Sequence, residues 1–208
     1  MNIFDQIVLL ATGLVALYLV WRFVDHYRQS PGKPLQDIYY AASFAVLLVA
    51  GLLLIVLSYS VLQSPLVVIV AALIPLCLSL GLVSEFFPAW GKGYLIFALV
   101  GLVAIAVTRF TGPAGLATGT LVIWHSIAGL IIFGLPLWAV TQGKAPGGFI
   151  GVTVGGVLIG LGGIALAFVK TGSQLLFFSP EVVFAILAPL LLLMTLAFAW
   201  GFMEKAKV

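Results

Sequence analysis

Seven long apolar stretches alternate with short polar connections along the whole chain. They lie at about residues 3–24, 36–59, 66–87, 93–112, 117–141, 148–170 and 181–203. A helix needs about 20 apolar residues to cross the hydrocarbon core of a bilayer, and each stretch reaches that length. The pattern therefore predicts seven transmembrane helices, and the short loops predict that consecutive helices pack as antiparallel neighbours.

The composition agrees with an all-α integral membrane protein. The chain is 63% hydrophobic and only 7% charged, whereas soluble domains carry about 25% charged residues. No connection is long enough to hold a soluble domain, so residues 1–208 are interpreted as a single polytopic domain in a cell membrane. The nine basic residues are scattered and form no basic face, which argues against a nucleic-acid partner.

Basic residues predict the orientation. Two of them, Arg109 and Lys170, fall at one end of the predicted helices. The other seven fall at the opposite end: Arg22, Arg28, Lys33, Lys92, Lys144, Lys205 and Lys207. Because cytoplasmic loops carry the excess of Lys and Arg, this split predicts an outside N-terminus and a cytoplasmic C-terminus.

Motifs of common catalytic sites are absent from the sequence. It contains no HExxH, no GxSxG and no Gly-rich phosphate loop of the Walker type. Its one cysteine, Cys77, lies inside an apolar run and is no metal motif. No acid lies at the centre of a predicted span, which argues against a proton-coupled pump. The sequence thus indicates a protein that is not an enzyme and holds no metal.

His125 is the only histidine inside a predicted span. At helical spacing it shares a stripe with Gly129 and Pro136, which indicates that it faces other helices. An imidazole at this depth needs a partner, because lipid offers none. Two interpretations stay open: a ligand, heme or proton site, and a packed histidine hydrogen-bonded to a neighbouring hydroxyl or carbonyl.

Heme is the cofactor that His125 suggests, but the sequence does not favour it. The other histidine, His26, lies past the far end of the first span. The two histidines differ in depth by roughly 20 Å at helical rise, so they cannot share one iron. Heme held by His125 and a methionine, or by a partner's histidine, remains open, and the cofactor is otherwise not identified.

Glycines and prolines mark candidate packing and bending positions. Four glycines of the sixth span lie four residues apart in two stripes that predict close helix packing: Gly151, Gly155, Gly156 and Gly160. Three spans contain a proline that frees a carbonyl one turn back and predicts a kink: Pro75, Pro136 and Pro189. The alternative for the glycine-rich span is a flexible helix that bends during transport.

Two charged residues lie about one turn inside predicted spans. They are Glu85 in the third span and Arg109 in the fourth, and they form a candidate polar site. The alternative is that each side chain extends to the nearest membrane surface, with no functional role.

Three functions fit this pattern. The first is a non-catalytic subunit or sensor-like module of a larger membrane assembly or homo-oligomer, which binds a lipid, quinone or pigment. On helix count and composition alone, the series is similar to the membrane sensor regions that precede some signalling kinases. The second is a small transporter, because spans one to three and five to seven run in matching directions. That parity is similar to the three-plus-one-plus-three arrangement of SWEET-type sugar carriers, although this chain has no Asn after Asn2. The third is a heme protein that uses His125.

Overall fold

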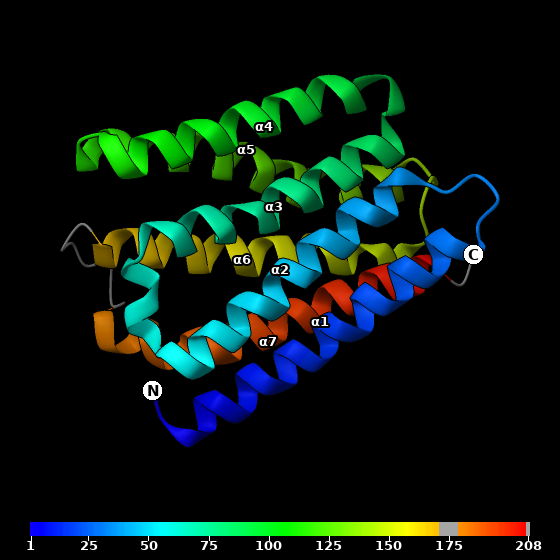
Figure 1. Cartoon of the computed structure of the whole chain (residues 1–208). Helices are drawn as coiled ribbons and strands as arrows, with labels where there is room; N and C mark the ends of the chain where they lie inside the picture. Colours follow the sequence, from blue (N-terminus) through cyan, green and yellow to red (C-terminus); the bar gives the residue numbers. More distant parts are fainter. Residues whose placement is uncertain (171–178, 207–208) are drawn as a thin grey trace.

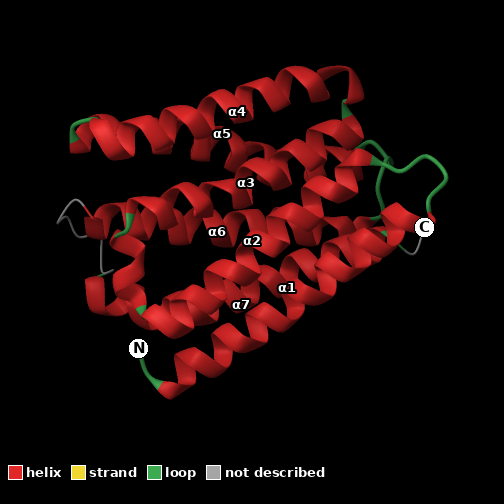
Figure 2. Cartoon of the chain, viewed as in Figure 1, coloured by secondary structure: helices red, strands yellow, loops and turns green. Residues whose placement is uncertain are grey.

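The computed structural model describes residues 1–170 and 179–206 and folds them into helices without a strand (Figure 2). Seven α-helices follow one another in the described chain: α1 (Ile3–Gln29), α2 (Leu35–Leu57), α3 (Pro65–Phe86), α4 (Pro88–Thr111), α5 (Ala114–Thr141), α6 (Ile150–Lys170) and α7 (Pro180–Lys205). Two short 3-10 helices, η1 (Tyr59–Gln63) and η2 (Gly147–Phe149), precede α3 and α6. Each predicted span falls on one of the seven α-helices.

Helix ends differ from the predicted ends where polar residues continue a helix. Helix α1 runs on through Asp25 and Arg28 to Gln29, because the chain remains helical until the turn at Pro31. Helix α4 begins at Pro88 rather than near residue 93. Proline suits the first helical position, since its fixed φ is helical and its missing N–H would be unpaired there. Hydropathy detects only the apolar part of a helix, so it missed both extensions.

The start of α1 is fixed by a reciprocal cap. The backbone N–H of Asp5 donates to Asn2 Oδ1 over 2.8 Å, and the backbone N–H of Asn2 donates to Asp5 Oδ2 over 3.2 Å. This capping box satisfies two backbone donors that a helix start leaves open. The Asp5 carboxylate is buried in this arrangement.

Six helices form a closed ring, in which each contacts the next in the order α1, α2, α3, α5, α6, α7 and back to α1. Helix α4 lies outside this ring and packs against α3 and α5 (Figure 1). Consecutive helices also contact one another, as the short loops predict. The two termini lie at opposite ends of the bundle (Figure 1).

Side chains fill the inside of the ring. One cluster of buried residues draws on all six ring helices and includes Leu19, Phe44, Leu47, Leu78, Leu82, Ile132, Val152, Met194 and Phe198. Polar side chains at this depth bond to backbone carbonyls: Ser43 Oγ donates to Ile74 O over 2.8 Å, and Thr153 Oγ1 donates to Phe133 O over 2.9 Å. Burying these hydroxyls therefore leaves no unpaired donor.

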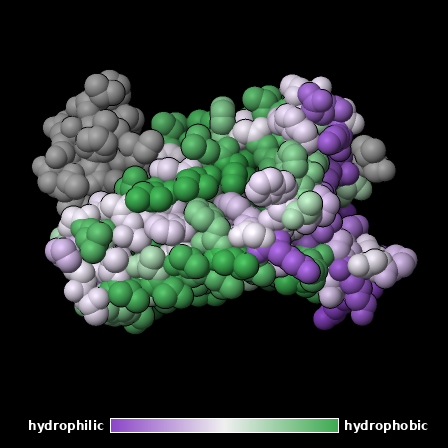
Figure 3. All heavy atoms as spheres, turned by 90° about the horizontal axis from the view of Figure 1, so that it is seen from above, coloured by the Kyte–Doolittle hydropathy of each residue, from purple (hydrophilic) through white to green (hydrophobic). Residues whose placement is uncertain are grey.

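The face of the bundle in Figure 3 is largely apolar between its ends and hydrophilic at one end. Exposed apolar side chains on α4 alone include Ile96, Leu99, Val103 and Val107. By length and composition, α1 to α5 and α7 are each suited to cross a membrane, and a shorter apolar stretch covers Gly147–Gly163, from η2 into α6. The chain is thus an all-helical apolar bundle of the kind that multi-pass membrane proteins form.

The two ends of the bundle carry different charge. We call "the charged end" the end with the α1–α2, α3–α4 and α5–α6 connections and the last turn of α7. Hydrophilic residues gather there (Figure 3), and its basic residues include Arg28, Lys33, Lys92, Lys144 and Lys205. The opposite end, where α1 begins, is called the N-terminal end.

Candidate functional site

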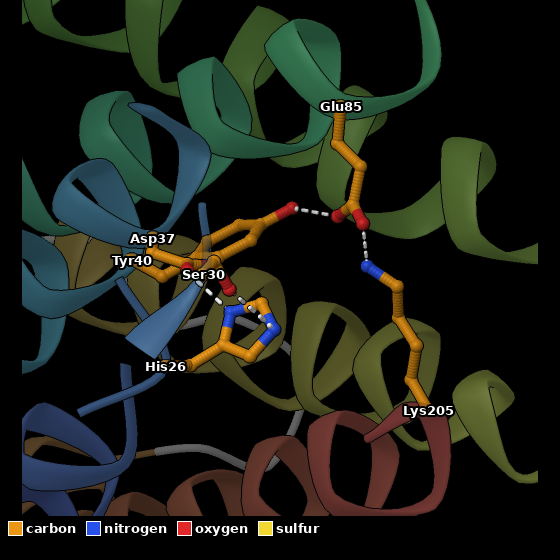
Figure 4. Close-up of polar contacts among 6 residues, drawn as sticks. All are labelled: His26, Ser30, Asp37, Tyr40, Glu85 and Lys205. Carbon is orange, nitrogen blue, oxygen red and sulfur yellow. Dashed lines mark hydrogen bonds and ion pairs between the residues drawn. The ribbon is translucent and has the colours of Figure 1, made fainter. Parts of the chain in front are cut away.

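A polar network joins three helices at the charged end. Glu85, one residue before the end of α3, accepts a hydrogen bond at Oε2 from the Tyr40 hydroxyl of α2 over 2.8 Å. Its other oxygen, Oε1, pairs with Nζ of Lys205, the last residue of α7 (Figure 4). The Glu85 and Lys205 side chains are only 17% and 24% exposed, so the pair is largely removed from water. Glu85 therefore compensates much of the Lys205 charge, and the nearby Asp37 carboxylate adds to this compensation.

Aromatic rings form the base of this network. The Lys205 ammonium lies 5.3 Å from the ring centre of Phe86 and 5.2 Å from that of Phe149, both within the range of cation–π attraction. The Tyr40 ring lies 4.7 Å from Phe202 and 5.0 Å from Phe23, centre to centre. The amine thus sits between a carboxylate and two aromatic faces, which restricts where it can move.

Glycine at position 81 explains how Tyr40 reaches Glu85. The Tyr40 ring, 1% exposed, lies directly over Gly81 of α3, where any Cβ would collide with the ring atoms. Gly81 and Glu85 are one helical turn apart, so they lie on the same face of α3. A ring that packs on Gly81 therefore points its hydroxyl along α3 to the Glu85 carboxylate.

A second polar pair lies beside the first and connects α1 with α2. Nδ1 of His26 lies 2.5 Å from Asp37 Oδ2, and Nε2 of His26 lies 3.3 Å from the Ser30 hydroxyl (Figure 4). The Asp37 side chain is buried, whereas the His26 side chain is 64% exposed. Asp37 stands in the first turn of α2, where a negative charge complements the helix dipole.

The candidate residues Glu85 and Arg109 do not form one site. Glu85 belongs to the network at the charged end, whereas Arg109 stands in the last turn of α4 at the N-terminal end. The buried Nε of Arg109 has no hydrogen-bond partner in the described chain. Tyr40 and Lys205 were not singled out as site residues from the sequence. The four-residue spacing of Gly81 and Glu85, and a lysine in the last turn of an apolar helix, are the sequence features that could have identified them.

His125 lies half-buried on α5 and faces α6. Its Nε2 is 3.5 Å from the position that a Cβ on Gly163 would occupy. Within the described residues His125 makes no hydrogen bond, and Gly163, which it faces, has no side chain that could form one. Its stripe is closely packed at Ile132 and Pro136, which are buried, while Gly129 has no atom within 4 Å of its Cβ position.

Three of the four candidate glycines of α6 lie at close helix contacts. A Cβ on Gly151 would lie 2.7 Å from Ala197 O and from Gly201 N of α7. Gly155 lies against the Phe198 ring, and Gly156 lies against Ile132 of α5. At Gly160 no atom of the described residues lies within 4 Å of the Cβ position, so its part in helix packing stays a prediction. Close contact returns further along α6, where a Cβ on Gly162 would lie 2.6 Å from Leu190 Cδ2 of α7.

The three candidate prolines lie inside uninterrupted helices, with Pro75 in α3, Pro136 in α5 and Pro189 in α7. Pro136 frees the carbonyl of Ile132, since proline has no N–H to donate to it. That carbonyl lies 3.3 Å from the Cβ position of Gly156, so the missing side chain lets α6 approach it. A proline and a glycine on neighbouring helices thus share one close contact.

At the N-terminal end, a cavity of about 420 Å³ is lined by Asp5, Tyr59, Glu181 and Phe184, among others. The Tyr59 and Phe184 rings stack with their centres 5.4 Å apart. Burial, and next the charge of Asp5, raise the pKa of the Tyr59 hydroxyl to about 12. Tyr59 therefore stays neutral at physiological pH.

The described residues include no group of three or more His, Cys, Asp or Glu side chains that could hold a metal ion. The polar network can do two things: it can hold helices together, and it can respond to a change of charge.

Comparison with known proteins adds no relative, since no family model, no curated protein and no solved structure matches this chain.

Proposed function

We propose that the chain is a non-catalytic, multi-pass protein of a cell membrane, and that it serves as a subunit or sensor-like module of a larger assembly. Its N-terminus lies outside and its charged end lies in the cytoplasm, on the basis of the distribution of Lys and Arg. One observation carries the proposal: the inside of the ring is filled, while a polar network joins α2, α3 and α7 at one end.

The filled ring supports a protein that does not itself move a solute. Transporters place their substrate sites near the middle of the membrane, at the interface between repeats. In this chain the corresponding depth is occupied by apolar side chains such as Phe44, Ile132 and Phe198. The polar atoms nearby, on Ser43 and Thr153, are bonded to backbone carbonyls.

The network supports a sensor-like role for α7. Lys205 ends this helix, and its pairing with Glu85 fixes the end of α7 against α3. A charge change at Glu85 or Lys205 would leave the other charge uncompensated among aromatic rings, which is unfavourable. Movement of α7 is the response that would return the unpaired group to water.

The assembly is tested by purification in a mild detergent followed by native mass spectrometry. The expected result is a stoichiometric partner or a defined oligomer of this chain. A monodisperse single chain, isolated without partners at several detergent concentrations, would contradict the assembly. A reporter fused after Val208 tests the orientation, and activity of that reporter only outside the cell would contradict a cytoplasmic C-terminus.

Transport is the second candidate, and the position of α4 favours it. In the sequence this helix comes between one group of three helices (α1 to α3) and another (α5 to α7), and it packs outside the ring against α3 and α5, as a linker helix would. Uptake of labelled solutes by liposomes that contain the purified protein is the test. Uptake that requires the protein and saturates with solute would support transport over the sensor-like role.

Heme binding is the third candidate, and it depends on the His125 imidazole, which has no hydrogen bond within the described residues. Absorbance of the purified protein tests it. A Soret band in the wild-type protein that disappears in both His125→Gln and His125→Leu, with expression unchanged, would support a heme ligand. Without such a band, His125→Gln is expected to be mild, since an amide can still form hydrogen bonds.

A further inference from the structure

An aromatic groove opens on the side of the bundle, next to the charged end. It has a volume of about 570 Å³ and is lined by Val83 near the end of α3, by Phe87 between α3 and α4, and by Trp90, Gly93, Tyr94 and Phe97 from the first half of α4. That volume lies within the range of about 300–1,000 Å³ that is typical of small-molecule sites. Trp90 is 72% exposed and Phe87 is 39% exposed, so the groove is open to the surroundings of the bundle.

The walls of the groove are apolar and held in place. The Tyr94 hydroxyl donates to Ser79 Oγ over 2.9 Å, which directs its polar atom into the helix pair and leaves the ring in the wall. The Phe97 ring stacks on Trp124 of α5 with 5.7 Å between ring centres. At Gly93 no atom lies within 4 Å of the Cβ position, so this residue leaves the groove open. These walls suit an apolar chain.

A positive charge stands beside the groove. The Lys144 ammonium lies 4.4 Å from the centre of the Trp138 ring, and that ring lies 4.8 Å from the ring of Phe87 in the groove wall. The acid nearest in sequence to the lining, Glu85, is engaged by Tyr40 and Lys205. An anionic group next to the groove would therefore meet Lys144 without a competing free carboxylate from Glu85.

We propose that this groove binds an anionic phospholipid, with one acyl chain along the aromatic wall and the phosphate near Lys144. Apolar walls and an adjacent cation match a molecule that has an apolar chain and an anionic head. The inference rests on the membrane placement proposed above, because the charged end then lies at the level of the lipid head groups.

The test measures lipid binding to lipid-depleted protein in detergent by native mass spectrometry. The probes are dioleoyl phosphatidylglycerol, which is anionic, and dioleoyl phosphatidylcholine, which is zwitterionic. Gly93→Phe places a ring in the groove at a position where its Cβ meets no described atom within 4 Å, and about a tenfold loss of affinity for both lipids is expected. Gly119→Phe is the matched control, since Gly119 is also open but lies near the opposite end, on α5.

The charge is tested with Lys144→Gln. Affinity for phosphatidylglycerol should fall about fivefold, to the level of phosphatidylcholine, because one cation near a membrane surface contributes about that much. Lys92→Gln is the control: Lys92 has the same charge and lies at the same end, but at 100° per residue it is on the opposite face of α4 from Trp90. It should leave the preference unchanged.

Trp90→Ala provides a second variant that cannot disturb the core, because Trp90 is exposed, and it should lower the affinity for both lipids. The proposal is overturned if Gly93→Phe and Trp90→Ala bind as the wild type does, or if Lys144→Gln and Lys92→Gln have equal effects. These outcomes are independent of the reporter and partner experiments. The groove can thus fail while the membrane placement stands, and a chain that is not found in the membrane fraction would refute the placement itself.

Discussion

Helix α7 is attached to the rest of the bundle in two different ways. Along its length it meets α6 through glycines, with Gly151 and Gly201 so close that a Cβ on Gly201 would lie 2.6 Å from Val152 N. At its last residue it meets α3 through the Lys205–Glu85 ion pair. The first contact is backbone against backbone, and the second joins two side chains that carry charge.

The two contacts are suited to different roles: the glycine contact to stabilising the bundle, and the ion pair to responding to a change of charge. Close packing at small residues depends on van der Waals contact, which does not change with pH or salt. A partly buried ion pair contributes less net stability, because desolvation of both charges offsets their attraction. It is, however, sensitive to any change in either charge. We therefore expect the glycine contact to hold α7 and the ion pair to set the position of its end.

The largest effect is expected from one methyl group at the glycine contact. Gly151→Ala places a Cβ 2.7 Å from Ala197 O and Gly201 N, and backbone atoms cannot rotate away as a side chain can. We expect a loss of about 2–3 kcal/mol, typical of overpacking. It would appear as a lower thermal midpoint in detergent.

Gly160→Ala is the matched control, because it makes the same change on the same helix, where no atom of the described residues lies within 4 Å of the Cβ position. It should leave the thermal midpoint unchanged or raise it, since alanine favours a helix by about 1 kcal/mol over glycine. Equal losses in the two variants would show that the α6–α7 contact is not the cause.

Glu85→Ala comes next, because it leaves Lys205 unpaired between Phe86 and Phe149. We expect a loss of about 1–2 kcal/mol, less than for a fully buried pair, because both side chains retain some exposure to water. The double variant Glu85→Met with Lys205→Met should recover more than half of that loss in thermal stability, because neither charge remains. No recovery would mean that the side chains act independently.

The sequence predicted the helices well, because each apolar stretch must satisfy its own backbone within a membrane and only a helix does so. It could not predict the partners of those helices. Glu85 and Lys205 are 120 residues apart, so no spacing relates them. Gly151 and Gly160 belong to the same glycine pattern, yet only Gly151 meets a neighbouring backbone. Helix crossing decides such contacts, and it depends on side chains of both helices at once.

Tyr40→Phe sharpens the comparison by removing one oxygen from the network while keeping the ring on Gly81. Glu85 keeps Lys205 but loses the hydrogen bond from the Tyr40 hydroxyl. We expect a loss of about 1 kcal/mol, the usual contribution of such a bond, measured as a thermal midpoint in detergent. Tyr39→Phe is a control on the neighbouring residue, and a similar loss there would show that the effect does not come from the network.

The smallest effect is expected at the pair of His26 and Asp37. This pair lies at the charged end, as the Lys205–Glu85 pair does, but neither of its residues belongs to α7. His26→Gln removes an imidazole that is 64% exposed, and the glutamine amide can still donate to Asp37. With His26 largely exposed, the pair should contribute about 0–1 kcal/mol, so the thermal midpoint should change by no more than about 4 °C. His26→Ala should cost more, because it leaves the buried Asp37 carboxylate without its donor. If His26→Gln instead lowered the midpoint as much as Glu85→Ala, the polar residues of the charged end would act as one unit, and the separate role of the α7 contact would be wrong.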